Sequence, residues 1–559
     1  MKDIPMLREK QIEQLGFYLS HPKCLDLSDP GTGKTPPCCV YAYYMWDELA
    51  KRTLWTMPKS LLKKNKDELL RFTEFESNDV AIMRTDRANM TKDWTGPTVQ
   101  SFRTKRGFEV MVQGIRTNTI DLREGLGEPT PFYYREVLHT AAGPAAQWRF
   151  LNPGAQPLVD YVNEPHGLLC EPVRGPDGEP LKITKRIPET FKDLIVDAVE
   201  HGAKTFICTF AFAMAHHERL LAAAPDIDLL LVDELHMPGG YSTPDTKVTE
   251  SFYAINRHVS RFVGMTGTLI NGRLDSAFAA LHVIEPRYYG NLQGFYFEHA
   301  AVIDDYGRVV VWKNEEKLRK IIEKHSIRRT FEEVYGKEDV VFFAEYAEMG
   351  LQVREKYQEF HDNALLECEE GRVIEGTSPG VALIRARQIM SHPATIIGPQ
   401  NELTGKDERV QIHLTEGKKT LLFASLVPEQ ERLVKLCQDM GLRVGLINGN
   451  TDGKGRERID AAAQRGDLDV IVASGPTAAV GYNWEMFDLV IFVSIDFLDV
   501  NILQAYRRAS RGSRTTTLRV VMLRYRDSVD DRMFEIVKAK SQLANRVDPS
   551  RPVLEFEEL

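Results

Sequence analysis

The chain has 559 residues, about three to four times the usual size of one domain, so it must form two or more hydrophobic cores. Hydrophobic residues make up 43% of the sequence and charged residues 27%, which excludes a disordered or fibrous chain. The formal charge of -9 has the wrong sign for a protein that coats nucleic acid by bulk attraction. Any contact with nucleic acid must therefore be local.

The cysteines and the N-terminal residues indicate the compartment. Seven cysteines are scattered without a C-x-x-C pair, which indicates neither a disulfide framework nor a zinc site and favours a reducing compartment. Residues 1–15 are charged where a signal peptide needs an apolar core, and no run reaches the roughly 18 apolar residues of a membrane span. We expect a cytoplasmic protein from a bacterium or a virus-infected host cell, without a membrane contact.

Short apolar runs without polar alternation predict strands that are buried on both faces of parallel sheets, with helices between them. In the first half of the chain these runs occupy residues 25–27, 53–56, 205–208 and 229–232. In the second half they occupy residues 421–423, 444–447, 470–472, 489–493 and 520–523. The sequence therefore predicts an α/β protein with two parallel-sheet domains in tandem.

Residues 87–202 do not continue the alternation of predicted strands and helices, because they are rich in glycine and proline. We expect an inserted subdomain there. We place the first domain at residues 1–325 and the second at residues 326–559. Aromatic residues stand beside arginines in the insertion, at Phe132, Tyr133, Tyr134, Arg135, Trp148, Arg149 and Phe150. They form either the subdomain's own core, which we favour, or a surface that stacks on unpaired bases.

A phosphate-binding loop follows the first apolar run. Residues 28–35 read Ser-Asp-Pro-Gly-Thr-Gly-Lys-Thr, a variant in which Ser28 replaces the usual first glycine. Lys34 is placed to reach the β and γ phosphates of ATP, and the Thr35 hydroxyl to ligate Mg²⁺. The nucleotide-binding residues expected here are Gly31, Thr32, Gly33, Lys34 and Thr35. The two prolines after Thr35 are tolerated in a first helical turn, so we expect a helix to begin there.

Acidic residues follow the apolar run 229–232, at the edge where open α/β sheets bind ligands. We expect Asp233 to hold Mg²⁺ together with Thr35. Glu234 is our candidate general base, because phosphoryl transfer to water needs a group that orients and deprotonates the nucleophile. His236 either links the nucleotide site to the second domain or is a packed histidine, and we favour the link.

The order of these motifs resembles that of the superfamily 2 helicases and translocases, which are DExH-type ATPases, and within them the Swi/Snf-like branch. Residues 7–11 match the family's Leu-Arg-x-x-Gln, which implies that Gln11 reads adenine. Residues 265–271 resemble the Thr-Gly-Thr motif that couples hydrolysis to movement, and residues 327–330 and 388–393 resemble further signatures of the branch. The resemblance implies two RecA-like lobes in tandem, with an insertion in the first lobe.

Two motifs of the second lobe complete the resemblance. Residues 474–484 align with the fifth motif and retain Gly481, although alanines stand where two glycines are common. Residues 504–511 align with the sixth motif, which implies a nucleotide contact for Gln504. Arg507 replaces the glycine that is usual in that motif.

The arginines of the sixth motif are candidate arginine fingers. Arg508 and Arg511 keep the family's places, and residues three apart lie on the same face of a helix. From that face they would reach the γ-phosphate across the cleft between the lobes. Taken alone, the spacing is also typical of a basic, solvated helix.

The resemblance further implies a set of nucleic-acid contacts, at Lys59, Ser60, Thr209, Phe210, Ser425, Asn448 and Thr477. Hydroxyl and amide groups suit contacts with phosphates and do not read bases, so we expect sequence-independent binding of duplex or branched DNA. For each residue alone, a loop position without a DNA role fits equally well.

The sequence as a whole predicts an ATP-dependent DNA translocase or helicase. It would couple ATP hydrolysis, with Mg²⁺, to movement along duplex or branched DNA and to its remodelling. We expect a monomer in which the insertion at 87–202 is available to a protein partner. Two alternatives stay open: an RNA helicase, and a nucleotide-gated clamp that binds DNA without net translocation.

Overall fold

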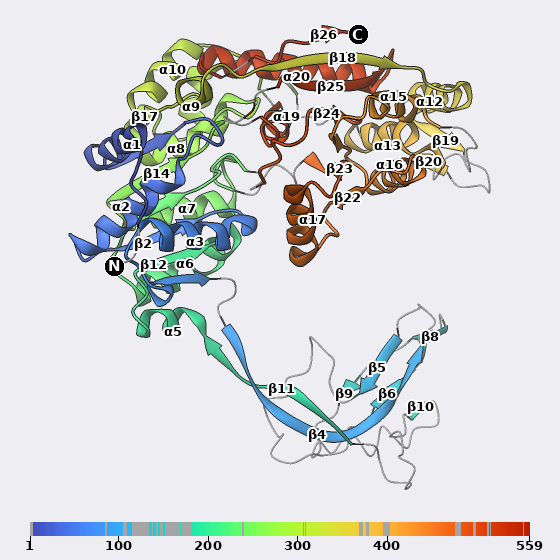
Figure 1. The fold of residues 1–559 in the computed structure, drawn as a ribbon. Helices are drawn as coiled ribbons and strands as arrows, with labels where there is room; N and C mark the ends of the chain where they lie inside the picture. The colour runs from blue at the N-terminus through green and yellow to red at the C-terminus, as the bar shows by residue number, and fades with distance from the viewer. Residues whose placement is uncertain are drawn as a thin grey trace. The chain divides into compact units, whose positions relative to one another are not determined.

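The structure is a computed structural model of the whole chain (Figure 1). It describes residues 4–83, 87–103, 109–113, 134–136, 138–140, 143–145, 149–150, 168–169, 182–237, 240–305, 307, 309–367, 373–375, 379–394, 403–475, 482–495, 499–510, 514, 516–551 and 553–559. The chain divides into two compact units. One consists of Met1–Arg84 with Gly202–Leu559, and the other is Thr85–His201.

A seven-stranded sheet forms the first half of the larger unit, and all its strands are parallel. The strands in spatial order are β17 (Ser326–Ile327), β1 (Lys23–Asp26), β14 (Arg261–Met265), β13 (Ile227–Val232), β2 (Arg52–Thr56), β12 (Thr205–Cys208) and β3 (Val80–Met83). The apolar runs predicted as strands in this half lie in β1, β2, β12 and β13. They are buried on both faces because helices cover both sides of a parallel sheet.

Helices pack on this sheet as the predicted class requires. The helices are α1 (Glu9–Ser20), α2 (Thr35–Asp47), α3 (Leu62–Phe72), α6 (Phe210–Ala223), α7 (Lys247–His258), α8 (Phe278–Ile284), α9 (Leu292–His299) and α10 (Glu315–Lys324), whereas α5 (Leu194–Glu200) belongs to the smaller unit. Buried residues of the first three helices form one core with Trp55, Leu231 and Val263 of the strands. A hairpin of β15 (Ala300–Ile303) and β16 (Val309–Trp312) precedes α10.

A second seven-stranded sheet, again with parallel strands only, follows in the chain. Its spatial order is β22 (Val444–Ile447), β23 (Val470–Ala473), β21 (Thr420–Phe423), β24 (Leu489–Phe492), β25 (Leu518–Tyr525), β18 (Val340–Ala347) and β26 (Glu557–Glu558). The helices of this half are α11 (Phe331–Tyr335), α12 (Leu351–Asn363), α13 (Pro379–Ser391), α15 (Gly405–Leu414), α16 (Val427–Asp439), α17 (Gly453–Arg465), α19 (Asp499–Tyr506) and α20 (Val529–Val547). The predicted class is confirmed: two RecA-like, parallel-sheet lobes lie in tandem.

The smaller unit is built around a long antiparallel ribbon. Strand β4 (Arg87–Arg103) pairs with β11 (Lys182–Asp193) from Arg87 opposite Asp193 to Pro97 opposite Lys182. Its far end also pairs with β5 (Glu109–Gln113). The side chains predicted to form a core there lie outside the part that the structure describes.

The predicted domain boundaries stay predictions. In the sheets, the last strand residue of the first lobe is Ile327 and the first of the second lobe is Val340. Among the described residues, no helix combines the length and the apolar character needed to cross a bilayer.

Candidate ATP site and contacts between the lobes

The phosphate-binding loop connects β1 to α2, and its turn depends on two glycines with left-handed backbone. Gly31 has a φ of 87° and Gly33 a φ of 94°. A Cβ atom added to Gly33 would lie 2.6 Å from Nη2 of Arg8 and equally close to Nε2 of Gln11. Position 33 therefore favours glycine for its conformation, and a side chain there would displace the ends of Arg8 and Gln11.

Side chains at the start of α1 bind the backbone of this loop. Nε2 of Gln11 donates a hydrogen bond to the Gly33 carbonyl at 3.0 Å, and Nη2 of Arg8 donates to the Thr32 carbonyl at 3.1 Å. The structure thus brings Gln11 to the nucleotide loop. Its role in reading adenine stays a prediction.

Lys34 folds back onto the loop. Its Nζ donates to the carbonyls of Ser28 at 2.6 Å and of Asp29 at 3.1 Å. Helix α2 begins at Thr35, and its two prolines fall in the first turn, as the sequence predicts. The positive ammonium and the helix N-terminus therefore meet at one place, which is the arrangement that binds phosphate.

The acidic pair follows β13, and only β14 separates that strand from β1. Asp233 is buried, and its carboxylate accepts hydrogen bonds from Nδ2 of Asn65 and from the backbone amide of Glu234, both at 3.0 Å. Burial and the neighbouring Glu234 carboxylate raise the pKa of Asp233, and Lys34 opposes the rise. A nearby divalent cation would keep this carboxylate ionised, so its chemistry fits a Mg²⁺ ligand.

Glu234 has a φ of 52°, which is uncommon for a residue with a side chain. Its carboxylate Oε2 lies 3.5 Å from Nδ1 of His236, and 21% of its side chain is exposed. Strained backbone of this kind gathers at functional sites. These features are compatible with a base that reaches water, and that role of Glu234 stays a prediction.

His236 touches both lobes. Its Nδ1 lies 2.7 Å from Oγ1 of Thr266, which follows β14, and its Nε2 lies 2.8 Å from Nε2 of Gln504 in α19. The Gln504 amide nitrogen is the donor to Nε2, so the ring proton lies on Nδ1 and is donated to Thr266. The structure therefore brings together the predicted link residue and the predicted glutamine of the sixth motif.

The His236 ring is neutral in the folded chain. Burial lowers its pKa to about 3, with Arg551 and Lys34 contributing in the same direction. A neutral imidazole has one donor and one acceptor, which matches its two partners. Protonation would turn Nε2 into a second donor facing the Gln504 amide and would break this contact.

The arginine fingers are described in part. Arg508 follows α19, is buried, and has a backbone carbonyl that accepts the Trp484 amide at 2.7 Å. Arg511, Gly481 and Thr477 lie outside the described residues. A contact of either arginine with a γ-phosphate stays a prediction.

Comparisons with known proteins agree with the motif order. The model of the helicase conserved C-terminal domain matches residues 405–513. Chromodomain-helicase-DNA-binding protein 1-like of Mus musculus is 24% identical over 339 residues, covering 57% of this chain and 36% of that protein. The chain is thus similar to the Swi/Snf-like branch of the superfamily 2 helicase-type ATPases.

Further relatives carry names of the same branch. The CHD3-type chromatin-remodeling factor PICKLE of Arabidopsis thaliana is 21% identical over 346 residues, covering 57% of this chain and 24% of that protein. A solved structure, the Sulfolobus solfataricus SWI2/SNF2 ATPase core in complex with dsDNA, matches 100% of this chain and 98% of its own at 15% identity, with a TM-score of 0.35. The chain spans about a third or less of the length of the first curated relatives.

The predicted nucleic-acid contacts differ in exposure. Lys59 and Ser60, in the turn η1 (Lys59–Leu61) after β2, are exposed, and so is Ser425 after β21. Thr209 caps α6, and its Oγ1 accepts the Phe212 amide at 3.1 Å. Lys59 and Ser60 are open to a phosphate backbone, whereas Oγ of Ser425 already accepts a hydrogen bond from Nη2 of Arg387 at 2.8 Å.

Two other predicted contacts are occupied inside the protein. The Phe210 ring is buried and meets the Tyr241 ring edge-on at 5.0 Å between centroids. Asn448 is buried, and its Nδ2 donates to Oε1 of Gln430 at 3.1 Å. Both side chains already have partners within the protein. Their role in nucleic-acid binding stays a prediction.

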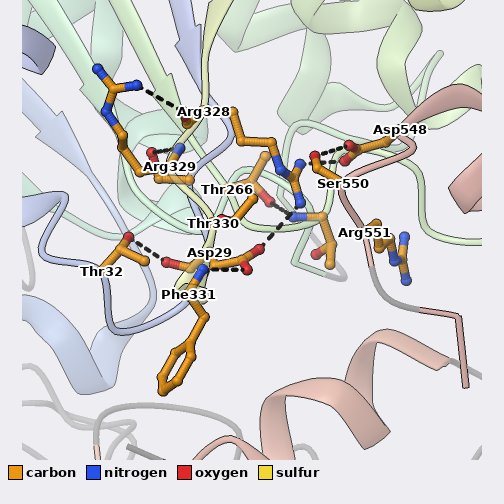
Figure 2. A network of polar contacts seen from close by, with 12 residues as sticks. Asp29, Thr32, Thr266, Arg328, Arg329, Thr330, Phe331, Asp548, Ser550 and Arg551 are labelled. Atoms are coloured by element: carbon orange, nitrogen blue, oxygen red, sulfur yellow. Dashed lines mark hydrogen bonds and ion pairs between the residues drawn. The ribbon is translucent and has the colours of Figure 1, made fainter. Parts of the chain in front are cut away.

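An arginine near the C-terminus joins the lobes, and no sequence motif marks it. Arg551 is buried and donates to the Ile270 carbonyl in the first lobe and to the Asp499 carboxylate at the start of α19 (Figure 2 shows Arg551 and its surroundings). Arg328, which follows β17, forms an ion pair with Asp548, three residues before Arg551. These partners lie far apart in the sequence, so local patterns do not reveal them.

We expect a His236→Gln variant to lose less stability at low pH than the unchanged chain. The ring takes up a proton near pH 6.5 when unfolded but only near pH 3 when folded, so its burial destabilises the folded state increasingly as the pH falls below 6.5. Chemical unfolding at pH 7.5 and 5 should show a fall in the free energy of unfolding that is smaller in the variant by about 2 kcal/mol. Equal falls would contradict the neutral ring.

We expect Arg551→Ala to lower the free energy of unfolding by about 3–5 kcal/mol, because it leaves the buried Asp499 carboxylate without its ion-pair partner. The double variant Arg551→Met with Asp499→Leu removes both charges and should recover most of that loss. Denaturant unfolding measures both. A loss below about 1 kcal/mol for Arg551→Ala would show that the pair is not essential.

Proposed function

We propose that the chain is an ATP-dependent DNA translocase that couples hydrolysis to movement along duplex or branched DNA. The observation that carries the proposal is the contact of His236 with both Thr266 and Gln504. His236 and Thr266 belong to the lobe that holds the phosphate-binding loop, and Gln504 belongs to the other lobe. A change at the nucleotide is therefore transmitted to the contact between the lobes.

The chain's own residues supply binding and proton transfer in this proposal. Lys34 leaves the carbonyls of its loop and contacts the β and γ phosphates, and the backbone amides of Gly33, Lys34 and Thr35 bind the same anion. Glu234 orients the attacking water and takes its proton. Arg508 and Arg511 offset the charge that develops on the γ-phosphate.

Thr35 and Asp233 are the residues that would hold Mg²⁺. When bound, the ion neutralises charge on the phosphates. Asp233 fits this role because it is a buried carboxylate whose hydrogen bonds from Asn65 and Glu234 fix its orientation. In this proposal Thr35 contributes its hydroxyl from the first residue of α2.

Bound nucleic acid would lie across both lobes, on Lys59, Ser60, Thr209 and Phe210 in the first and on Ser425, Asn448 and Thr477 in the second. Closure and opening of the lobes then moves the strand by steps, because one ATP is shared between two bodies. The named relatives include helicase-DNA-binding and chromatin-remodeling proteins, which supports DNA as the substrate.

The remaining parts of the proposal concern organisation. The lobes are residues 1–325 and 326–559, and residues 87–202 form an insertion that is available to a protein partner. The chain acts as a monomer in the cytoplasm of a bacterium or of a virus-infected cell.

We expect Lys34→Ala and Glu234→Gln to lower DNA-stimulated ATP hydrolysis by at least about 100-fold, since one loses the phosphate contact and the other the base. Steady-state ATPase rates with duplex DNA, single-stranded DNA and RNA at one salt concentration measure this. The matched controls are Lys435→Ala and Glu535→Gln, which change exposed residues of α16 and α20.

Full activity in either site variant would refute the assigned site. Stimulation by RNA alone would replace the DNA translocase with an RNA helicase. Displacement of the third strand from a triplex tests translocation, and hydrolysis without displacement would leave a nucleotide-gated clamp.

A further inference from the structure

The carboxylate of Asp29, inside the phosphate-binding loop, is the meeting point of three segments. Its Oδ1 accepts Nη2 of Arg328 at 3.2 Å, and its Oδ2 accepts the Phe331 amide at 3.0 Å (Figure 2). Nη2 of Arg507 lies 3.3 Å from the same Oδ2. Only 3% of Asp29 is exposed, so these contacts replace water almost completely.

The donors come from separate parts of the fold. Arg328 and Phe331 belong to the segment that follows β17, whereas Arg507 directly follows α19 in the second lobe. Asp29 and Arg507 are 478 positions apart in the sequence. The ion pair therefore connects the loop that would hold the phosphates with the helix that carries the sixth motif.

The pair is charged on both sides. Burial raises the pKa of Asp29, but the Arg507 and Arg328 guanidiniums outweigh it and hold the pKa below its ordinary value. Arg507 is itself buried, and Oε2 of Glu338 lies 3.8 Å from its Nη2. An ionised carboxylate and a guanidinium with little water between them interact strongly and fix their geometry.

Arg507 is followed at once by Arg508, a candidate arginine finger. Whatever fixes the Arg507 guanidinium also limits where the next residue's backbone lies. The sixth motif usually has glycine at this position, which has no side chain to reach Asp29. The cross-lobe ion pair thus depends on a residue that distinguishes this chain from the usual motif.

We propose that Asp29 and Arg507 form a positioning pair, which orients the end of α19, and with it Arg508, against the phosphate-binding loop. The inference rests on the proposed ATPase function, because the finger matters only if a γ-phosphate is cleaved. Neither residue touches the reacting atoms. Their effect on the rate passes through Arg508.

A double-mutant cycle tests the pair with Asp29→Asn, Arg507→Gln and the double variant. Each single change should lower kcat for DNA-stimulated ATP hydrolysis about 10-fold, and KM for ATP should change less than about threefold. The double variant should be no slower than the slower single variant, because either single change already removes the one interaction that the two residues share. Arg507→Lys, which keeps the charge, should recover at least a third of kcat.

The control is Arg443→Gln, which removes an exposed Arg443 to Asp469 ion pair of the same lobe and should leave kcat unchanged. Single effects that multiply to about 100-fold in the double variant would overturn the positioning pair while leaving the ATPase function intact. An effect confined to KM would overturn it as well.

A second measurement does not need activity. Hydrogen exchange of residues 499–510 in the nucleotide-free chain should become faster in Asp29→Asn, although that substitution lies in the other lobe. Unchanged exchange there would refute the pair in a folded protein. If the unchanged chain shows no nucleic-acid-stimulated hydrolysis, the proposed function falls, and this exchange result still decides whether the pair exists.

Discussion

The structure depends on one buried imidazole that must stay uncharged. His236 fills a site between Thr266 and Gln504 in which water is excluded, and one ring nitrogen donates while the other accepts. If water filled this contact, it would replace the hydrogen bonds of His236, and separation of the lobes would cost little free energy. A dry, directional contact makes their separation cost a hydrogen bond. The edge of the first sheet that carries Asp233 and Glu234 is thereby connected to the second lobe.

Ion pairs lie on either side of His236 and fix the orientation of the second lobe against the first. Asp29 binds Arg507 on one side of the junction, and Arg551 binds Asp499 and the Ile270 carbonyl on another. Buried ion pairs add little net stability, but they demand one geometry. The second lobe is therefore held in a defined register against the phosphate-binding loop, which suits an enzyme that completes its site from both lobes.

Much of the fold could be predicted from the sequence, because strands such as β13 and β24 are apolar on both faces and need no partner to be recognised. The phosphate-binding loop and Asp233 can be predicted from the sequence because their chemistry is local to a few residues, and their roles stay predictions. Asp29, Arg507 and Arg551 were not given these roles, since a pair 478 positions apart depends on how the two lobes meet. The sequence places Phe210 among the nucleic-acid contacts, but it does not reveal that the ring is buried against Tyr241, because that contact depends on the fold.

The most direct test is an experimental structure of the chain with duplex DNA, Mg²⁺ and ADP bound to aluminium fluoride, a mimic of the γ-phosphate in the transition state. The account predicts that the mimic lies between Lys34 and the guanidinium of Arg508 or Arg511, with His236 still joined to Gln504. A filled site in which both arginines point away from the mimic would contradict it.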